Sequence, residues 1–479
     1  MFRRRFSGLP PDPYFPPDLK ELGYFINEQD EIRNSKDPRF YFKYFLTKNE
    51  RWNDRQRFAM NEAVEVIVHD RLKELGLAKI RLPLGAGPKD RHVPIFVSPD
   101  LTTASRVVLI VGESEQELGV LAHRVIGGKG GIDAGSLVSA VRRLRSSPPS
   151  SSPDDDDDED GDDQQQQQQQ QPPAVVLANT GQLFWWPEGG RALNPPTRHQ
   201  VPRKSAVHYG LRYDPAAHAV PGHEDRLAHV RSLFRDVLAG MKQGAVLDVV
   251  GLGDGADAVT EFLNCEQSWR DWGARLGCLA VVAGFYDVAQ VKVEGLKTFL
   301  KERARAYICC EQPVGTPISA AAGNPLTVRF TDFGCPVYAS GELYYTETAF
   351  VSARDLVLDF LDEAARDPEG FRNPEMCVEY TDPGREQQDG DYDASSGWGE
   401  AEWNNKPEVT FARPNDENKK PVASAAEGSG TTEDPAFEKV VGGKSGAFGV
   451  EPVEGGAGML KEQDAPPRGP EGIRSEAFI

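Results

Sequence analysis

One stretch of the sequence, residues 244–263, constrains the fold more than any other. It reads GAVLDVVGLGDGADAVTEFL and begins with an apolar run, Ala245 to Val250, that is typical of a buried strand. Glycines at positions 251, 253 and 255 follow, and the residues after them have the pattern of a helix. A buried strand, a glycine turn and a helix together predict a β-α unit of a mostly parallel sheet.

The glycines of this stretch fit the frame of a nucleophile elbow, which is written G-x-S-x-G in α/β-hydrolases. The five positions here are Gly251, Leu252, Gly253, Asp254 and Gly255, so glycine stands where the nucleophilic serine belongs. A hydrolase triad also needs a histidine after the elbow in the chain. The last of the eight histidines is His229, which precedes the elbow. We therefore expect a degenerate elbow with neither nucleophile nor general base.

Three alternatives compete with this interpretation. A dinucleotide-binding fingerprint, G-x-G-x-x-A, is matched at Gly251, Gly253 and Ala256, but the acidic candidate Asp287 lies 31 residues further on instead of roughly 20. A second alternative makes Asp254 the nucleophile, which places the large Leu252 where the turn needs a small residue. The third is a glycine-rich turn with only a packing role, of which a degenerate elbow is a special case.

The oxyanion loop of a hydrolase would follow the apolar strand predicted at 106–114, RVVLIVGES. Val111, Gly112 and Glu113 stand there. A carboxylate next to the reacting carbonyl would oppose the negative charge of an oxyanion. We interpret these residues as a degenerate oxyanion loop, and the alternative is a solvent-facing glutamate.

The rest of residues 1–376 alternates strands with helices. A helix is predicted at 52–75, strands at 79–84 and 92–98, and a last helix at 352–365 that begins with a capping box, Ser352 and Asp355. This alternation predicts a single α/β domain, 1–376, with one doubly wound, mostly parallel sheet.

Two segments have the composition of disordered chain. Residues 146–173 contain nine acids and a run of glutamines, and residues 377–479 are rich in glycine, serine, proline and acids. The net charge is +5 for 1–150, −9 for 151–171, −5 for 172–376 and −11 for 377–479. The two parts predicted to fold are together neutral, which does not favour direct RNA binding. We interpret 146–173 as a loop insertion and 377–479 as a tail.

Other functional classes have little support in the sequence. The six cysteines contain no C-x-x-C pair, so we expect small buried thiols of a reducing compartment and neither a metal nor another cofactor. No run of 18 apolar residues indicates a membrane span, and the N-terminus has no apolar segment of a signal peptide.

Several segments taken in order resemble one family. They are FPPDLKELGYFINEQDEIR, RVVLIVGES, LAHRVI with GIDAGS, the elbow strand, and VLDFLDEAARDPEGFRNPEM. Together they resemble the fungal Arb-two domain family, whose founding member is an Argonaute-binding subunit of the siRNA chaperone complex. The resemblance covers residues 2–376 without the acidic insertion.

The resemblance implies an α/β-hydrolase-like fold and a non-catalytic scaffold in small-RNA-guided heterochromatin formation. The implied partners are Argonaute and a second Argonaute-binding subunit, with siRNA contacted through Argonaute, in the nucleus and also in the cytoplasm. Related domains occur in class II histone deacetylases, so a deacetylase-associated silencing module is an alternative. A divergent hydrolase that uses Ser114 or Ser340 is another.

The tail carries a motif of its own, DASSGWGEAEW. Trp398 lies between Gly397 and Gly399, and Trp403 follows five residues later. Tryptophan in an acidic, aromatic-poor segment resembles the Argonaute-binding tails of other silencing proteins, and tryptophan often anchors an interface. We interpret Trp398 as the anchor of an Argonaute hook and Trp403 as an auxiliary contact. The alternatives are a chance occurrence or a tail that packs on its own domain.

Overall fold

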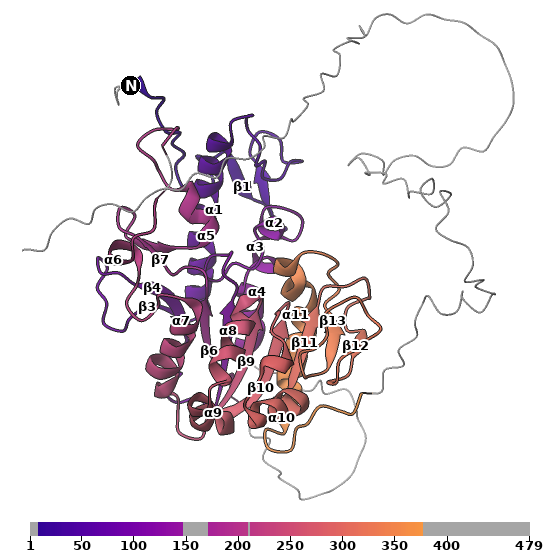
Figure 1. The fold of residues 1–479 in the computed structure, drawn as a ribbon. Helices are drawn as coiled ribbons and strands as arrows, with labels where there is room; N and C mark the ends of the chain where they lie inside the picture. Colours follow the sequence, from indigo (N-terminus) through magenta and orange to yellow (C-terminus); the bar gives the residue numbers. More distant parts are fainter. Residues whose placement is uncertain (1–7, 147–170, 209–210, 377–479) are drawn as a thin grey trace, which may run out of the picture. The chain divides into compact units, whose positions relative to one another are not determined.

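A mixed, mostly parallel sheet forms the centre of the molecule (Figure 1). The computed structural model describes residues 8–146, 171–208 and 211–376. Within them, nine strands form one sheet in the order β12-β13-β11-β10-β9-β5-β6-β4-β3. The neighbouring pairs β6-β5, β5-β9, β9-β10, β10-β11 and β11-β13 are parallel. The outer pairs β3-β4, β4-β6 and β12-β13 are antiparallel. The predicted α/β fold with a doubly wound, hydrolase-like sheet is confirmed.

The strands of the main sheet are β3 (Ala78–Leu82), β4 (Val93–Val97), β5 (Arg106–Gly112), β6 (Ala174–Asn179), β9 (Val246–Leu252), β10 (Leu276–Val282), β11 (Ala304–Ile308), β12 (Pro317–Ser319) and β13 (Val337–Ala339). Two small hairpins lie outside it, β1 (Tyr24–Ile26) with β2 (Ile32–Asn34) and β7 (Phe184–Trp186) with β8 (Arg191–Leu193).

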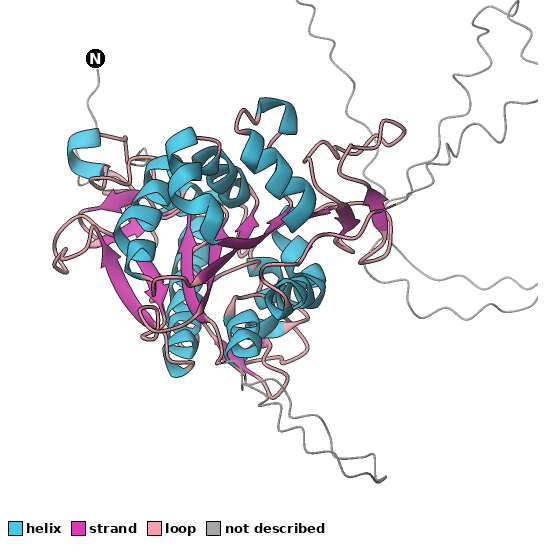
Figure 2. Ribbon diagram, turned by 90° about the horizontal axis from the view of Figure 1, so that it is seen from below, coloured by secondary structure: helices cyan, strands magenta, loops and turns pink. Residues whose placement is uncertain are grey.

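The longest helices are α1 (Glu50–Glu74) and α11 (Thr346–Arg366). The others are α2 (His123–Ile126), α3 (Gly131–Ala134), α4 (Val138–Arg145), α5 (Pro195–Gln200), α6 (Pro215–His218), α7 (Arg226–Ser232), α8 (Asp254–Leu263), α9 (Glu266–Trp272) and α10 (Glu294–Arg303). Helices lie on both faces of the sheet (Figure 2).

Each face of the sheet has its own core because side chains alternate along a strand. On β5, Val107, Leu109 and Val111 pack with residues of α7, α8 and α10. Val108 and Ile110 point to the other face and pack with α1, α4 and α11. All five of these residues have no exposed surface, as expected for a central parallel strand covered on both sides.

The glycine-rich stretch folds as strand, turn and helix, but the turn is shorter than the sequence suggested. Strand β9 extends through Gly251 to Leu252, and helix α8 begins at Asp254. Gly253 alone makes the turn, so Gly251 and Gly255 belong to the strand and to the helix. The ladder of β9 with β10 explains the extension, because Gly251 and Leu252 pair with Val281 and Val282.

The predicted capping box at Ser352 is wrong, because α11 begins six residues earlier at Thr346. Glu342 lies just before this helix, and its carboxylate accepts the backbone N–H groups of Leu343, Tyr344 and Tyr345 and the hydroxyl of Thr348. This arrangement holds the helix start from outside the helix. Ser352 is an exposed position in its second turn.

The two ends of the acidic insertion lie together at the surface. Arg145, at the end of α4, donates to the carbonyl oxygen of Pro173 at 3.2 Å and pairs with Asp100 at 2.6 Å. Pro173 immediately precedes β6. A loop insertion within the sheet domain requires such closeness. Residues 147–170 and the tail 377–479 lie outside the described residues.

Most of the described cysteines are sheltered, but the expectation of burial is wrong for Cys265. Cys278, Cys310 and Cys335 are buried, Cys309 is half-buried, and Cys265 is exposed at the N-cap of α9. Among residues 8–146, 171–208 and 211–376, no helix is long and apolar enough to cross a membrane. The same residues hold no group of three or more histidine, cysteine, aspartate or glutamate side chains placed to bind a metal ion.

Candidate functional site

The backbone at Gly253 has an unusual conformation. Its φ is 53° and its ψ is −132°, a combination of backbone angles that residues other than glycine rarely adopt. The Gly253 N–H donates to the carbonyl oxygen of Val282 at the end of β10, at 2.8 Å. The turn thus reverses the chain sharply between β9 and α8 and presents position 253 at the carboxyl end of the sheet.

The two flanking glycines are required by close packing. A Cβ atom at Gly251 would lie 2.4 Å from the Cα of Ala256, and one at Gly255 would lie 2.4 Å from the carbonyl oxygen of Val111. Glycine at these positions lets α8 approach β9 and β5 more closely than any side chain would permit. Close packing of α8 against β9 and β5 is therefore sufficient to explain glycine at positions 251 and 255, and no catalytic role is needed to explain it.

Glu113 occupies the space in front of the elbow. A Cβ atom at Gly253 would lie 3.1 Å from the Cβ of Glu113 and 3.2 Å from its Oε2. Burial and the nearby charges of Glu347 and Asp254 together raise the pKa of Glu113 to about 7, although the hydrogen bond from Gln116 lowers it. The alternative of a freely solvated glutamate is wrong, since the side chain is largely enclosed.

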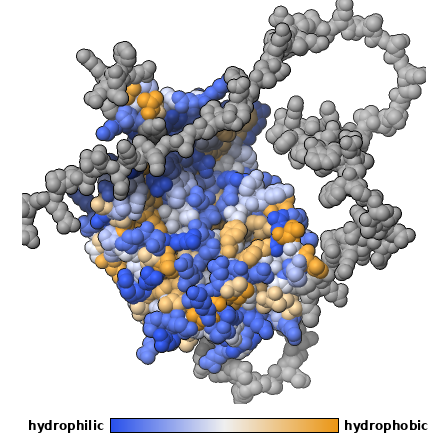
Figure 3. Space-filling model, in the orientation of Figure 1, coloured by the Kyte–Doolittle hydropathy of each residue, from blue (hydrophilic) through white to orange (hydrophobic). Residues whose placement is uncertain are grey.

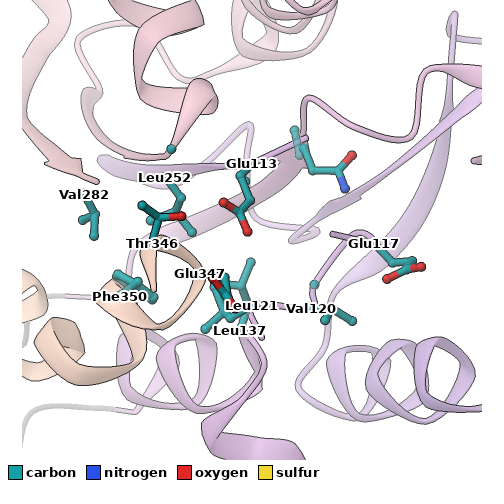
Figure 4. Close-up of a pocket in the computed structure, with 15 residues that line it drawn as sticks. Glu113, Glu117, Val120, Leu121, Leu137, Leu252, Val282, Thr346, Glu347 and Phe350 are labelled. Carbon is teal, nitrogen blue, oxygen red and sulfur yellow. The ribbon is translucent and has the colours of Figure 1, made fainter. Parts of the chain in front are cut away.

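The pocket beside the elbow is very small (Figure 4). The space open to the centre of a water molecule is about 20 Å³, which is close to what a single water needs. Glu113 and Glu347 turn their carboxylates toward this space, and Phe350 of α11 closes one side. The lining consists of Gly112, Glu113, Glu117, Gly119, Val120, Leu121, Leu137, Ala178, Asn179, Leu252, Gly253, Val282, Thr346, Glu347 and Phe350.

Asp254 has a positioning contact and not the geometry of a nucleophile. Its Oδ1 accepts the backbone N–H of Ser114 at 3.0 Å, and its Oδ2 lies 3.8 Å from Arg226. The carboxylate therefore fixes the loop after β5 against the start of α8. This contact also occupies one backbone donor of the loop in which a hydrolase would keep its oxyanion donors.

A glutamate–histidine pair lies close to the elbow, and sequence reasoning did not find it. His123 Nε2 lies 2.6 Å from Glu117 Oε2, and the other carboxylate oxygen of Glu117 accepts from Thr197 Oγ1 at 2.9 Å. Burial raises the pKa of Glu117, but the charge and hydrogen bond of His123 and the hydrogen bonds from Thr197 and the backbone together lower that pKa to about 2.

The pair was missed because a triad histidine is expected after the elbow and His123 precedes it. His123 also lines a polar cavity of about 270 Å³ together with Glu113, Glu115 and Glu347. The spacing of Glu117 and His123 in the sequence is no recognised motif, so only the fold could bring them to this place.

The other candidate residues have structural surroundings. Ser340 is fully buried, and its hydroxyl accepts from the backbone N–H of Glu342. Ser114 lies on the loop after β5, where its N–H is held by Asp254. Asp287 caps a short 3₁₀ turn through the N–H of Ala289 and does not end a strand beside the elbow. Gly397, Trp398, Gly399 and Trp403 lie outside the described residues.

Comparisons with known proteins place this geometry in a family. The model of the Arb2 domain matches residues 15–314. The cotranscriptional regulator ARB2A of Homo sapiens is 27% identical over 132 residues, which are 27% of this chain and 32% of that protein, and its Gallus gallus homolog is 29% identical over the same shares. The aligned part thus spans about a third of the curated relatives' length.

Among solved structures, a histone deacetylase from Saccharomyces cerevisiae is similar at a TM-score of 0.34 and 10% identity, covering 63% of this chain and 97% of that one. The family match covers well over half of the 479 residues and includes the elbow, the loop after β5 and the strands that carry them. The chain belongs to the Arb2 domain family.

Proposed function

We propose that this chain is a non-catalytic interaction subunit that acts in gene silencing at the level of chromatin or transcription. The observation that carries the proposal is the state of the elbow site. Glycine stands at the nucleophile position, Glu113 fills the space in front of it, and the adjoining pocket has room for about one water.

Each requirement of acyl transfer is unmet at this site. The reaction needs a nucleophile, a base within hydrogen-bond reach and donors for the oxyanion. Gly253 has no side chain, and its N–H is already bonded to Val282. The carboxylate of Glu113 would repel a developing oxyanion. His123, which is paired with Glu117, does not line the pocket at Gly253. We infer that the hydrolase-like fold serves as a scaffold.

The relatives support the proposed level of action. The similar proteins of Homo sapiens and Gallus gallus are named cotranscriptional regulators. We propose a nuclear role for this chain, with additional cytoplasmic presence, in small-RNA-guided heterochromatin formation. Argonaute and a second Argonaute-binding subunit are the proposed partners, and siRNA is bound through Argonaute. The alternative partner is a histone deacetylase.

The absence of catalysis is tested on the full chain with activated esters and a fluorophosphonate probe. We expect no turnover and no covalent label above that of a heat-denatured sample, because the elbow lacks every acyl-transfer group. Gly253→Ser serves as a second arm, and we expect it to stay inactive because its hydroxyl would face Glu113. Labelling of the wild type at Ser114 or Ser340, mapped by mass spectrometry, would establish a divergent hydrolase instead.

The partners are tested by affinity purification of the full chain from its own cells, followed by mass spectrometry. We expect Argonaute with the wild type, and small RNA that is lost when Argonaute is depleted. The tail motif is tested with Trp398→Ala and Trp403→Ala together, and Phe437→Ala is the matched aromatic control in the tail. Full retention of Argonaute by the double variant would assign binding to the folded domain. Recovery of a deacetylase without Argonaute would reverse the choice of partner.

A further inference from the structure

An apolar groove lies at the carboxyl end of β10 and β11, next to the elbow site. Its volume is about 350 Å³. The floor is formed by buried residues such as Ile308 and Phe333, and the rim carries the exposed side chains of Phe285, Val328 and Tyr344. Figure 3 shows apolar side chains at the surface beside β12 and β13. Contiguous exposed apolar surface of this kind marks interaction sites on soluble proteins.

The rim residues are exposed on a backbone that is held in place. Phe285 is 67% exposed, yet its N–H and that of Tyr286 donate to Asp257 Oδ1 at 2.8 and 3.0 Å. Tyr344 is 72% exposed, and its N–H donates to Glu342 at 3.1 Å. The chain around Val328 is fixed in the same way, because Arg329 N–H donates to Thr327 and its guanidinium pairs with Glu311.

Such fixed presentation matters for binding energy. A surface whose backbone is already ordered loses little entropy when a partner docks. Large apolar side chains that are held out into solvent also lose unfavourable hydration on contact. The groove is therefore preorganised for an apolar anchor residue of a partner.

Acidic side chains next to the groove indicate that the partner also carries a basic residue. Thr346 lines both the groove and the polar cavity that contains Glu113, Glu115 and Glu347, so the two spaces adjoin. The charged groups that act most strongly on Glu113 are all acidic, namely Glu347, Asp254 and Glu115. Arg57 and His123 line the same cavity, and His123 is paired with Glu117. Glu347 already pairs with Arg124 at 2.8 Å, and Asp254 lies 3.8 Å from Arg226. A cation beside Glu113 would neutralise a carboxylate for which the described residues give no salt bridge.

We propose that this groove docks an extended segment of a partner protein that places an aromatic or aliphatic side chain between Phe285 and Tyr344 and a lysine or arginine beside Glu113. The inference rests on the proposed function as an interaction subunit and names the surface and the chemistry of its partner. The apolar anchor supplies affinity, and the cation fixes direction and register.

The test uses a displayed library of random 12-residue peptides panned against the immobilised full chain. We expect enriched peptides that carry a basic residue within four positions of an aromatic or aliphatic one. Synthetic versions should bind about tenfold more weakly to Phe285→Ser/Tyr344→Ser, since losing anchor contacts is worth that much at a hot spot. Tyr14→Ser/Val207→Ser removes equally exposed apolar residues outside the groove and should bind like the wild type.

The charge contribution is measured with Glu113→Gln/Glu115→Gln. These changes keep side-chain shape, and we expect weaker peptide binding that depends less on salt than binding to the wild type. The proposal is overturned if no peptide is enriched, if the enriched peptides lack basic residues, or if they bind the groove variant as well as the wild type. Argonaute recovery is read separately, so failure of the peptide test with Argonaute still recovered rejects this surface and leaves the proposed function standing.

Discussion

Replacing Gly255 with alanine tests whether packing alone explains the glycine frame of the elbow. A Cβ atom at this position would lie 2.4 Å from the Val111 carbonyl oxygen and 2.7 Å from that of Gly112. Both atoms belong to the backbone of β5, which pairs with β6 and β9 on its two sides. Neither atom can turn away as a flexible side chain would, so α8 must move.

The size of the effect follows from these contacts. Reaching a contact distance of 3.0 Å requires a shift of 0.6 Å between α8 and β5, the difference between 3.0 and 2.4 Å. Overpacking of a rigid core costs about 1–3 kcal/mol and occasionally more, and we expect the upper end, about 3 kcal/mol of unfolding free energy. Gly255 has no positive φ, so backbone strain adds nothing to this figure.

Two other glycines separate the possible causes. Gly244 has a φ of 77° and no atom within 4 Å of an added Cβ, so Gly244→Ala should cost only the left-handed strain, about 1 kcal/mol. Gly240 has neither strain nor a close neighbour, so Gly240→Ala should change stability by less than about 1 kcal/mol, with a gain possible through the unfolded chain.

Urea unfolding of the three full-length variants, followed by tryptophan fluorescence, gives the midpoint and slope of each transition. The expected order of destabilisation is Gly255→Ala, then Gly244→Ala, then Gly240→Ala. If Gly255→Ala is no less stable than Gly244→Ala, the close approach of α8 to β5 is not what holds glycine at this position.

Three further predictions concern stability. Asp248→Asn should cost about 3 kcal/mol of unfolding free energy, because it breaks the buried 2.6 Å ion pair with Arg106. The control Asp359→Asn removes a partner from an exposed ion pair and should cost less than about 1 kcal/mol. Equal costs of the two variants in urea unfolding would refute this distinction. Burial lowers the pKa of His229 to about 3 and of His223 to about 4, so both side chains must stay neutral in the folded protein. The stability that the fold gains from the neutral histidines is fully present above about pH 6.5 and is lost as the pH falls toward 4. Urea midpoints should therefore decrease from pH 7 to pH 5, and less steeply in His223→Phe/His229→Phe; an unchanged slope would contradict this. Replacing residues 148–172 with a short Gly/Ser linker should lower the melting temperature by less than about 5 °C, because Arg145 already holds the two ends together, and a larger drop would mean that the segment packs.

Hydrophobic pattern was sufficient for the central strands β5 and β9 and for helices α1 and α8. The apolar runs that became β5 and β9 are covered on both faces of the sheet, and a short continuous apolar run is typical of such a strand. Local signals failed where distant contacts decide. The start of α11 depends on Glu342, which accepts three N–H groups, and the Ser352 signal had no influence on it.

The sequence predicted single residues of the candidate site from their motif positions, but it did not predict which residues from distant parts of the chain meet there. Gly253 and Glu113 were named from motif positions, but their contact joins residues 140 apart in sequence. Glu117, His123 and Glu347 came to the same place from loops and a helix start that carry no motif. The rim of the apolar groove is assembled from three separate loops, so no sequence window contains it.

The backbone at Gly253 bears on how a serine nucleophile could arise at this elbow by mutation. A serine there would need the same turn geometry that the chain already has, so the first step changes the main chain little. The later steps lie in different elements: Glu113 would have to leave, the space closed by Phe350 would have to open, and a histidine would have to appear on a loop after the elbow. None of these changes brings activity without the others. Single substitutions at the elbow therefore offer no gradual route to hydrolysis, although the fold around it has the right shape.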